Sequence, residues 1–172
     1  VAADPLLRAA TPLVLHPERR WAEATADDLL IRSAGLETEL TEGGTPVPVA
    51  QAHGQAPDLS GGPNPVLAAT GSALVIGREA FVAAGGLGTH ADLPAAMVDL
   101  CLRHRANGGT VHCLPQSVLT DARPITDPQE LRAPLDPAGP AWRTLVEDHG
   151  PALQPGAGDN PTSKGLRIAL TT

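Results

Sequence analysis

Basic residues are scarce in this sequence. Lys and Arg number 12 against 19 Asp and Glu, which gives a formal net charge of −7, and no basic run is longer than Arg19-Arg20. A protein that binds nucleic acid neutralises the phosphate backbone with clustered cations. The charge pattern therefore argues against a nucleic-acid partner.

Cysteine is almost absent as well. The chain has two, Cys101 and Cys113, and no apolar secretory segment at its start. Two isolated thiols do not make the disulfide framework of a small secreted domain. We expect both to be reduced and buried, which favours a reducing, cytoplasmic location.

Long apolar runs are missing too. The longest, residues 65–76, is interrupted by Thr70, Gly71 and Ser72. A helix needs about 20 apolar residues to span a bilayer. The sequence therefore predicts a chain that does not span a membrane.

The length and the apolar content suit one folded domain. The chain has 172 residues, of which 42% are hydrophobic and 18% charged, so it can bury a core without disulfides or a structural metal. Gly and Pro number 18 each and predict many loops and breaks. We expect a loop-rich globule.

The hydrophobic pattern predicts an α/β fold. The second half is the clearer one, because its periodic segments are bounded by Gly, Pro and Asn. The expected elements are a strand at 13–15, helical turns within 26–34, a surface loop at 51–65, a strand at 67–76, a helix at 78–84, a helix at 95–106, a strand at 110–114 with a possible extension to 119, and a helix at 141–148.

The two ends of the chain suggest a piece of a longer protein. Residues 151–165 are rich in Gly, Pro, Asp, Asn and Ser, as expected of an interdomain linker. Residues 166–172 begin with an apolar run that predicts the first strand of a following domain. The chain also begins at Val1 rather than Met. On this interpretation residues 1–150 form one domain.

Residues 69–87 carry a family resemblance. Their sequence, ATGSALVIGREAFVAAGGL, matches without a gap the segment Thr-Gly-x-x-Leu-Leu-x-Arg-Arg-x-x-Phe-x-x-x-Gly-Gly-Phe of family 2 glycosyltransferases. Residues 96–103, AMVDLCLR, stand where that family has Glu-Asp-Val-Asp-Leu-x-x-Arg. Residues 108–119 resemble the strand and Pro-x-x-x-Val segment that follow. The specific match covers residues 69–119.

This resemblance implies a particular architecture and reaction. The fold would be the C-terminal, acceptor-side part of a GT-A domain, a layered Rossmann-like sheet with flanking helices. The reaction would transfer a sugar from a nucleotide sugar to a glycan or lipid-linked acceptor. In an intact member a Mn or Mg ion holds the diphosphate and a carboxylate of the Glu-Asp pair acts as general base. The nucleotide-binding half and its Asp-x-Asp motif would precede Val1, so we expect no metal cofactor in this chain.

The catalytic positions of that family are altered here. Ala96 and Met97 occupy the positions of the acid pair, and methionine cannot accept a proton. Gly88 and Thr89 stand where the family has the acids of a loop. Aromatic faces on which sugars pack are also few, since the chain has one Phe, two Trp and no Tyr. The resemblance therefore implies a fragment that is inactive as given.

Several residues allow two interpretations. Asp99 is a possible substitute base or a helix residue that supports the neighbouring loop, and Arg103 is an ion-pair partner or a phosphate clamp. Asp121 is the plausible metal ligand near the position of a late family histidine. The six His are scattered, with no pair at i, i+4, which argues against a zinc site.

Two functions from different classes follow. The first is a fragment of a glycosyltransferase. The second is a non-catalytic, degenerate transferase module that binds a glycan or serves as a scaffold for a neighbouring domain. The substitutions at Ala96 and Met97 favour the second.

Overall fold

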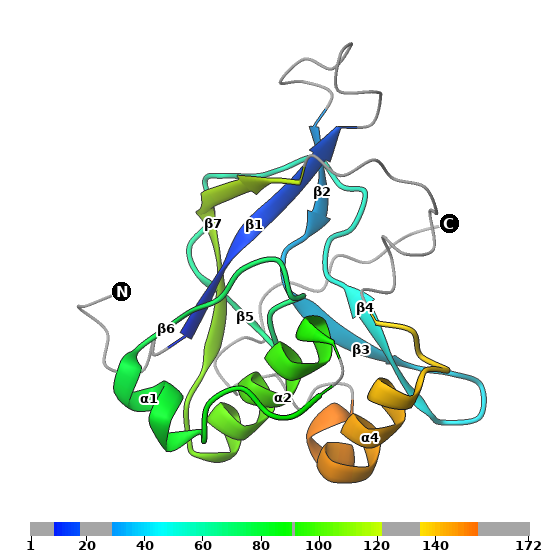
Figure 1. Ribbon diagram of the computed structural model, residues 1–172. Coiled ribbons are helices and arrows are strands. Elements are labelled where there is room, and N and C mark those ends of the chain that lie inside the picture. The colour runs from blue at the N-terminus through cyan, green and yellow to red at the C-terminus, as the bar shows by residue number, and fades with distance from the viewer. Residues whose placement is uncertain (1–8, 18–28, 91, 122–134, 155–172) are drawn as a thin grey trace.

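A computed structural model gives the structure of residues 9–17, 29–90, 92–121 and 135–154. In these residues the chain has a mixed α/β architecture, with a curled sheet and helices beside it (Figure 1). This agrees with the α/β class that the sequence predicts. The elements in chain order are β1 (Ala9–Pro17), β2 (Leu29–Ser33), β3 (Leu36–Leu40), β4 (Pro46–Ala50), β5 (Asn64–Val66), β6 (Val75–Ile76), α1 (Arg78–Ala83), α2 (Leu93–Ala106), β7 (Val111–Thr120), α4 (Pro140–His149) and the 3-10 helix η3 (Gly150–Leu153).

A parallel pair, β1 and β7, forms the centre of the larger sheet. The strand order among the described residues is β2-β1-β7-β5, with the short β6 also pairing with β1, and all pairs except β1 with β7 are antiparallel. β1 is buried from Ala9 to His16. Burial of successive residues without alternation is typical of a strand that is covered on both faces.

β7 changes character at its middle. Residues 111–115 alternate between buried and partly exposed, whereas residues 116–120 are exposed. The pairing with β1 shifts there, because Pro12 faces Leu114 while Leu13 faces Val118. Pro115 has no N–H to donate to the ladder, so an irregularity at this position is the expected result.

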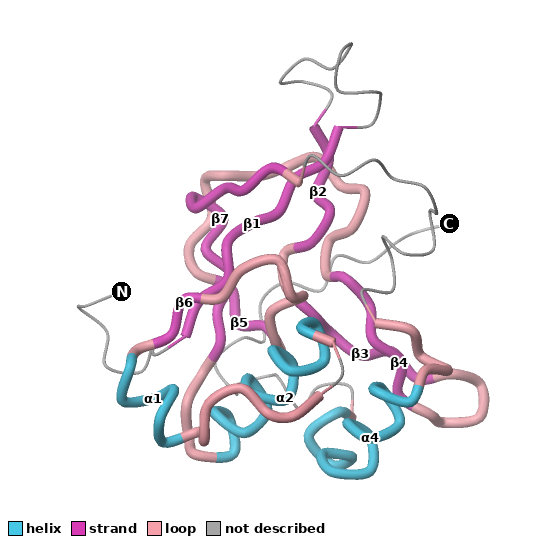
Figure 2. The backbone as a smooth tube through the Cα atoms, in the orientation of Figure 1, coloured by secondary structure: helices cyan, strands magenta, loops and turns pink. Residues whose placement is uncertain are grey.

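A separate hairpin of β3 and β4 lies beside α4 (Figures 1 and 2). Its strands are joined by residues 41–45, in which Gly44 has a φ of 78°. Trp142 of α4 is 1% exposed, and its Nε1 donates to the carbonyl of Pro46 at 2.9 Å. The indole therefore joins the helix to the hairpin by both packing and a hydrogen bond.

α2 packs its apolar side chains against the sheet. Val98 is 0% and Leu102 is 1% exposed, and both belong to the cluster that contains Leu13 and Val111 of the central strands. Burial of each such side chain contributes roughly 1.5–3 kcal/mol. The helix starts at Asp92, whose carboxylate accepts from the N–H of Ala95 at 2.7 Å. Both predictions, a helix here and burial of its apolar face, are confirmed.

Other predicted elements are also present. The helices expected at 78–84 and 141–148 are α1 and α4, and the strands expected at 13–15 and 110–119 are β1 and β7. Cys101 and Cys113 are free and buried as predicted, at 1% and 0% exposure. Burial raises the pKa of each thiol to about 11, although for Cys101 a backbone hydrogen bond from Ala69 and the charge of Arg105 oppose it.

The strand predicted at 67–76 is wrong for most of its length. Only Val75–Ile76 is a strand, while β5 ends at Val66 before that segment begins. Gly71, with a φ of 93°, turns the chain, and a Cβ there would lie 3.0 Å from the Cα of Pro94. The apolar character instead reflects close packing, because Ala68 and Ala69 are 0% exposed. Small buried residues in this run form a turn against α2, not a strand.

The helical turns predicted within 26–34 are also wrong. Residues 29–33 are β2, which pairs antiparallel with β1, and residues 26–28 lie outside the described residues. A short apolar run does not distinguish a strand from a helix by its period, and the partner strand decided the outcome. The hairpin of β3 and β4 was not predicted, although residues 36–40 alternate and Gly43-Gly44 follow them.

The end of the described chain packs into the domain. Leu153 of η3 is 0% exposed and belongs to the core. The predicted linker at 151–165 therefore begins with packed residues, and its remainder from residue 155 lies outside the described residues. The strand predicted at 166–172 lies outside them as well.

Candidate functional site

The positions that the family resemblance assigns to catalytic acids lie in the first turns of α2. Pro94 and the cap at Asp92 begin the helix, so residues 96 and 97 follow within one turn of its start. Ala96 is 5% and Met97 is 8% exposed, and Met97 is part of the hydrophobic core. Neither side chain can move a proton. These positions therefore serve packing.

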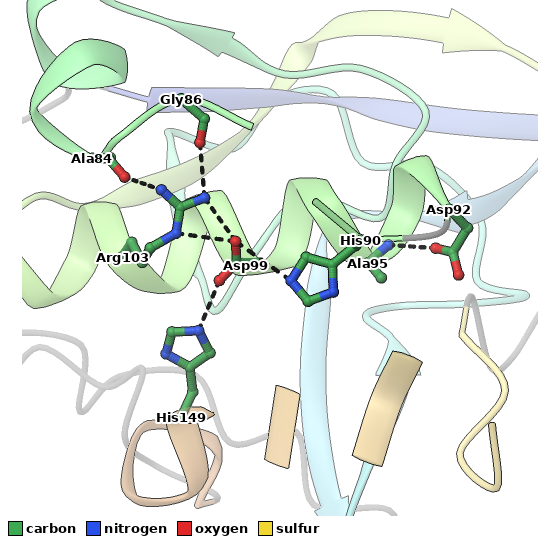
Figure 3. Close-up of polar contacts among 8 residues, drawn as sticks. All are labelled: Ala84, Gly86, His90, Asp92, Ala95, Asp99, Arg103 and His149. Atoms are coloured by element: carbon green, nitrogen blue, oxygen red, sulfur yellow. Dashed lines mark hydrogen bonds and ion pairs between the residues drawn. The ribbon is translucent and has the colours of Figure 1, made fainter. Parts of the chain in front are cut away.

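Asp99, one turn further along α2, is the centre of a polar cluster (Figure 3). Its Oδ2 accepts from Nε and Nη2 of Arg103 at 3.0 and 2.7 Å. Its Oδ1 lies 2.9 Å from Nε2 of His149, the last residue of α4. Nε2 of His90 is 3.5 Å from Oδ2. We call Asp99, Arg103, His149 and His90 the Asp99 cluster.

The Asp99 cluster is mostly shielded from solvent. The side chain of Asp99 is 9% exposed, and those of His90 and His149 are 13% and 15% exposed. Burial raises the pKa of Asp99, but the hydrogen bonds from Arg103 and His149 and the charges of Arg103 and His90 outweigh it. The net pKa lies below the ordinary value, so Asp99 is a carboxylate at neutral pH.

Arg103 connects this carboxylate to the loop that follows α1. Its Nη1 donates to the carbonyl of Ala84, and its Nη2 donates to the carbonyl of Gly86 at 2.8 Å (Figure 3). A Cβ placed on Gly88 would lie 2.6 Å from Oδ2 of Asp99, so the loop backbone lies directly against the carboxylate. The ion pair predicted for Arg103 is present, and Asp99 supports the loop.

Asp121 lies elsewhere, just beyond β7. Its carboxylate is 2.7 Å from Nη1 of Arg32 on β2, and its N–H donates to the carbonyl of Leu15 at 2.8 Å. The backbone of Arg32 also contacts His53, whose Nδ1 is 3.2 Å from the carbonyl of Arg32. The ring of His53 stacks on the ring of His16, with the two centroids 5.9 Å apart. Asp121 thus belongs to an ion pair that joins strands of the sheet.

The two acidic candidates are not brought together as a metal site. Across residues 9–17, 29–90, 92–121 and 135–154, no three His, Cys, Asp or Glu side chains are grouped so that they could hold a metal ion. Asp99 and Asp121 each face an arginine instead.

The described helices also include none that is long and apolar enough to cross a membrane.

His90 and His149 are the site residues that the sequence did not reveal. The spacing of Asp99 and Arg103 at i, i+4 on a predicted helix indicates an ion pair. His149 is 50 residues from Asp99 in the chain, and no local pattern links the two. Only the packing of α4 beside α2 brings this imidazole to the carboxylate.

Comparisons of the chain with protein-family models, with curated proteins and with solved structures gave no match.

Proposed function

We propose that this chain is the acceptor-side part of a GT-A-like, family 2 glycosyltransferase domain that acts as a non-catalytic module. The observation that carries the proposal is the burial of Met97 in the core, at the position where the family has its general base. A group that deprotonates an acceptor must reach the reacting hydroxyl and must accept a proton. Met97 does neither.

The contacts of Asp99 support the same proposal. As the surviving acid of the motif it is the candidate to replace the lost base, but both of its oxygens accept from other side chains. A carboxylate whose Oδ2 is held by Arg103 and whose Oδ1 is held by His149 is a poor proton acceptor, because these bonds lower the pKa of the carboxyl group. Asp99 therefore maintains the loop after α1 and does not serve as a base.

The module would bind a glycan or hold a neighbouring domain. On the resemblance, its parent reaction uses a nucleotide sugar and a glycan or lipid-linked acceptor, with Mn or Mg in an intact member. The two free, buried thiols of Cys101 and Cys113 support a reducing, cytoplasmic location.

The test is calorimetric titration of the chain with a panel of nucleotide sugars in the presence of Mn or Mg, together with an assay for released diphosphate. An active family 2 transferase serves as the positive control. We expect neither heat of binding at micromolar ligand nor turnover. A lost general base alone costs typically 10²–10⁴-fold in rate, and loss of the metal removes several kcal/mol more of transition-state stabilisation. Micromolar binding or turnover would refute the proposal.

The alternative is a transferase that is active when a nucleotide-binding half is present. The retained Asp99 and Arg103 of the motif favour it. A longer chain with an intact Asp-x-Asp motif would then turn over without changes at Ala96 and Met97. Turnover of the longer chain, with none in this chain, would support the alternative over the module.

A further inference from the structure

The carboxylate of Asp99 contacts two segments that are far apart in the sequence, the end of α4 and the loop between α1 and α2. His149, at the end of α4, reaches Oδ1 at 2.9 Å. On Oδ2 the carboxylate meets Arg103 at 2.7 Å and His90, from the loop between α1 and α2, at 3.5 Å. Figure 3 shows His149 and His90 approaching the same group from different directions. The end of α4 and the loop thus share one anchor.

The loop between α1 and α2 contacts the pair of Asp99 and Arg103 at several points. Arg103, held by Asp99, donates to the carbonyls of Ala84 and Gly86. Gly88 lies so close to Asp99 that a Cβ would be 2.6 Å from Oδ2. A rotation of the carboxylate would therefore move Arg103 and press on the backbone at Gly88. The N–H groups of Gly85 and Gly86 also donate to carbonyls of α1, so the orientation of Asp99 acts on the loop together with these bonds.

α4 has other contacts that hold most of the helix. Trp142 and Leu145 are 1% and 0% exposed, and the indole donates to the carbonyl of Pro46. Leu153, just after the helix, is 0% exposed. Removal of the imidazole of His149 would therefore free the end of the helix from Asp99 while the helix stays packed. A substitution of His149 therefore tests the contact with Asp99 without removing the packing of α4.

We propose that Asp99 couples the loop of residues 84–90 to the C-terminal end of α4, so that release of either segment loosens the other. A carboxylate that is 9% exposed needs all its donors, because an unsatisfied buried oxygen is costly. When His149 leaves, the carboxylate turns toward water, its hydrogen bonds from Arg103 weaken, and its contact with His90 is lost. Residues within one hydrogen-bonded network couple in this way, and the coupling is reciprocal. A partner that displaces the end of α4 would thereby open the loop.

The experiment is hydrogen exchange of the whole chain at pH 7, followed amide by amide, for His149→Ala. We expect exchange of residues 85–90 to become about tenfold faster, within the range found for coupled sites, along with faster exchange at residues 146–150. The matched control is Arg143→Ala, an exposed position on the same helix, which should leave residues 85–90 unchanged. Faster exchange confined to 146–150 in His149→Ala would overturn the coupling.

A second, independent experiment perturbs the loop and measures exchange at the end of α4. His90→Ala perturbs the loop side of Asp99, and reciprocity requires faster exchange at residues 146–150. If His149→Ala does not fold, this variant carries the test alone. Unchanged exchange at 146–150, with faster exchange at 85–90, would show that Asp99 holds the two segments independently and would overturn the proposal.

Discussion

Placing an acid at position 97, where the family that the sequence resembles has its base, should destabilise the protein. In Met97→Asp the chain loses the burial of a methionine side chain that is 8% exposed, which is worth roughly 1.5–3 kcal/mol. It also places a carboxyl group among the apolar residues of the core, where the charged form is disfavoured. Together these terms predict a loss of about 3–5 kcal/mol at pH 7, in the range of severe single substitutions. A domain of ordinary stability would become marginal.

The penalty should depend on pH in a defined direction. Burial raises the pKa of the new carboxyl group in the folded state above its unfolded value of about 3.9. Below that value the group is protonated in both states, and the electrostatic part of the penalty is absent. As the pH rises the unfolded state loses the proton first, so the penalty grows until the pH passes the folded pKa. The destabilisation should therefore be smaller at pH 4 than at pH 7.

Urea unfolding followed by circular dichroism at the two pH values measures both effects. The control is Met97→Leu, which keeps the volume and should cost less than about 1.5 kcal/mol. Should Met97→Asp lose under about 1 kcal/mol at pH 7, with no difference at pH 4, the side chain at 97 would have access to solvent. Such a result would contradict the placement of Met97 in the core.

Three further predictions concern the buried polar groups and thiols. The pKa of Asp99 is lowered in the folded protein, so its carboxylate stabilises the fold above the unfolded pKa of about 3.9, and this stabilisation is lost as the pH falls through the folded pKa. In Asp99→Asn the free energy of urea unfolding should therefore fall less steeply between pH 5 and 2 than in the unaltered protein, and an equal fall would contradict this. Trp142→Phe leaves the carbonyl of Pro46 without its indole donor and should cost about 1–3 kcal/mol in urea unfolding, while no loss would show that this bond contributes nothing. The thiols of Cys101 and Cys113, with pKa values of about 11, should resist alkylation by iodoacetamide at pH 8 in the native protein and should react in urea, as measured by mass spectrometry. Rapid alkylation of the native protein would disprove their burial.

Local signals allowed much of the second half to be predicted from sequence. Asp92 and Pro94 define the start of α2, and Gly108 and Gly109 follow its end, so the helix and its buried face could be predicted without tertiary information. Arg103 was expected to be an ion-pair partner, and its partner is Asp99, one helical turn earlier on α2. In these cases the physical cause lies within a few residues of its effect.

Only the tertiary structure decided what depends on partners far along the chain. Leu29–Ser33 is a strand because it pairs with β1. The chain after Val66 makes a turn at Gly71 because the backbone there lies against Pro94 at the start of α2. The same holds for the candidate site, since the packing of α4 beside α2 brings His149 to Asp99 across 50 residues of sequence. Short-range propensities are worth at most about 1 kcal/mol per residue, whereas pairing and burial in the assembled fold outweigh them. The sequence alone therefore determined α2, with its capped start and its buried face, and tertiary packing determined which strands pair and which side chains surround Asp99.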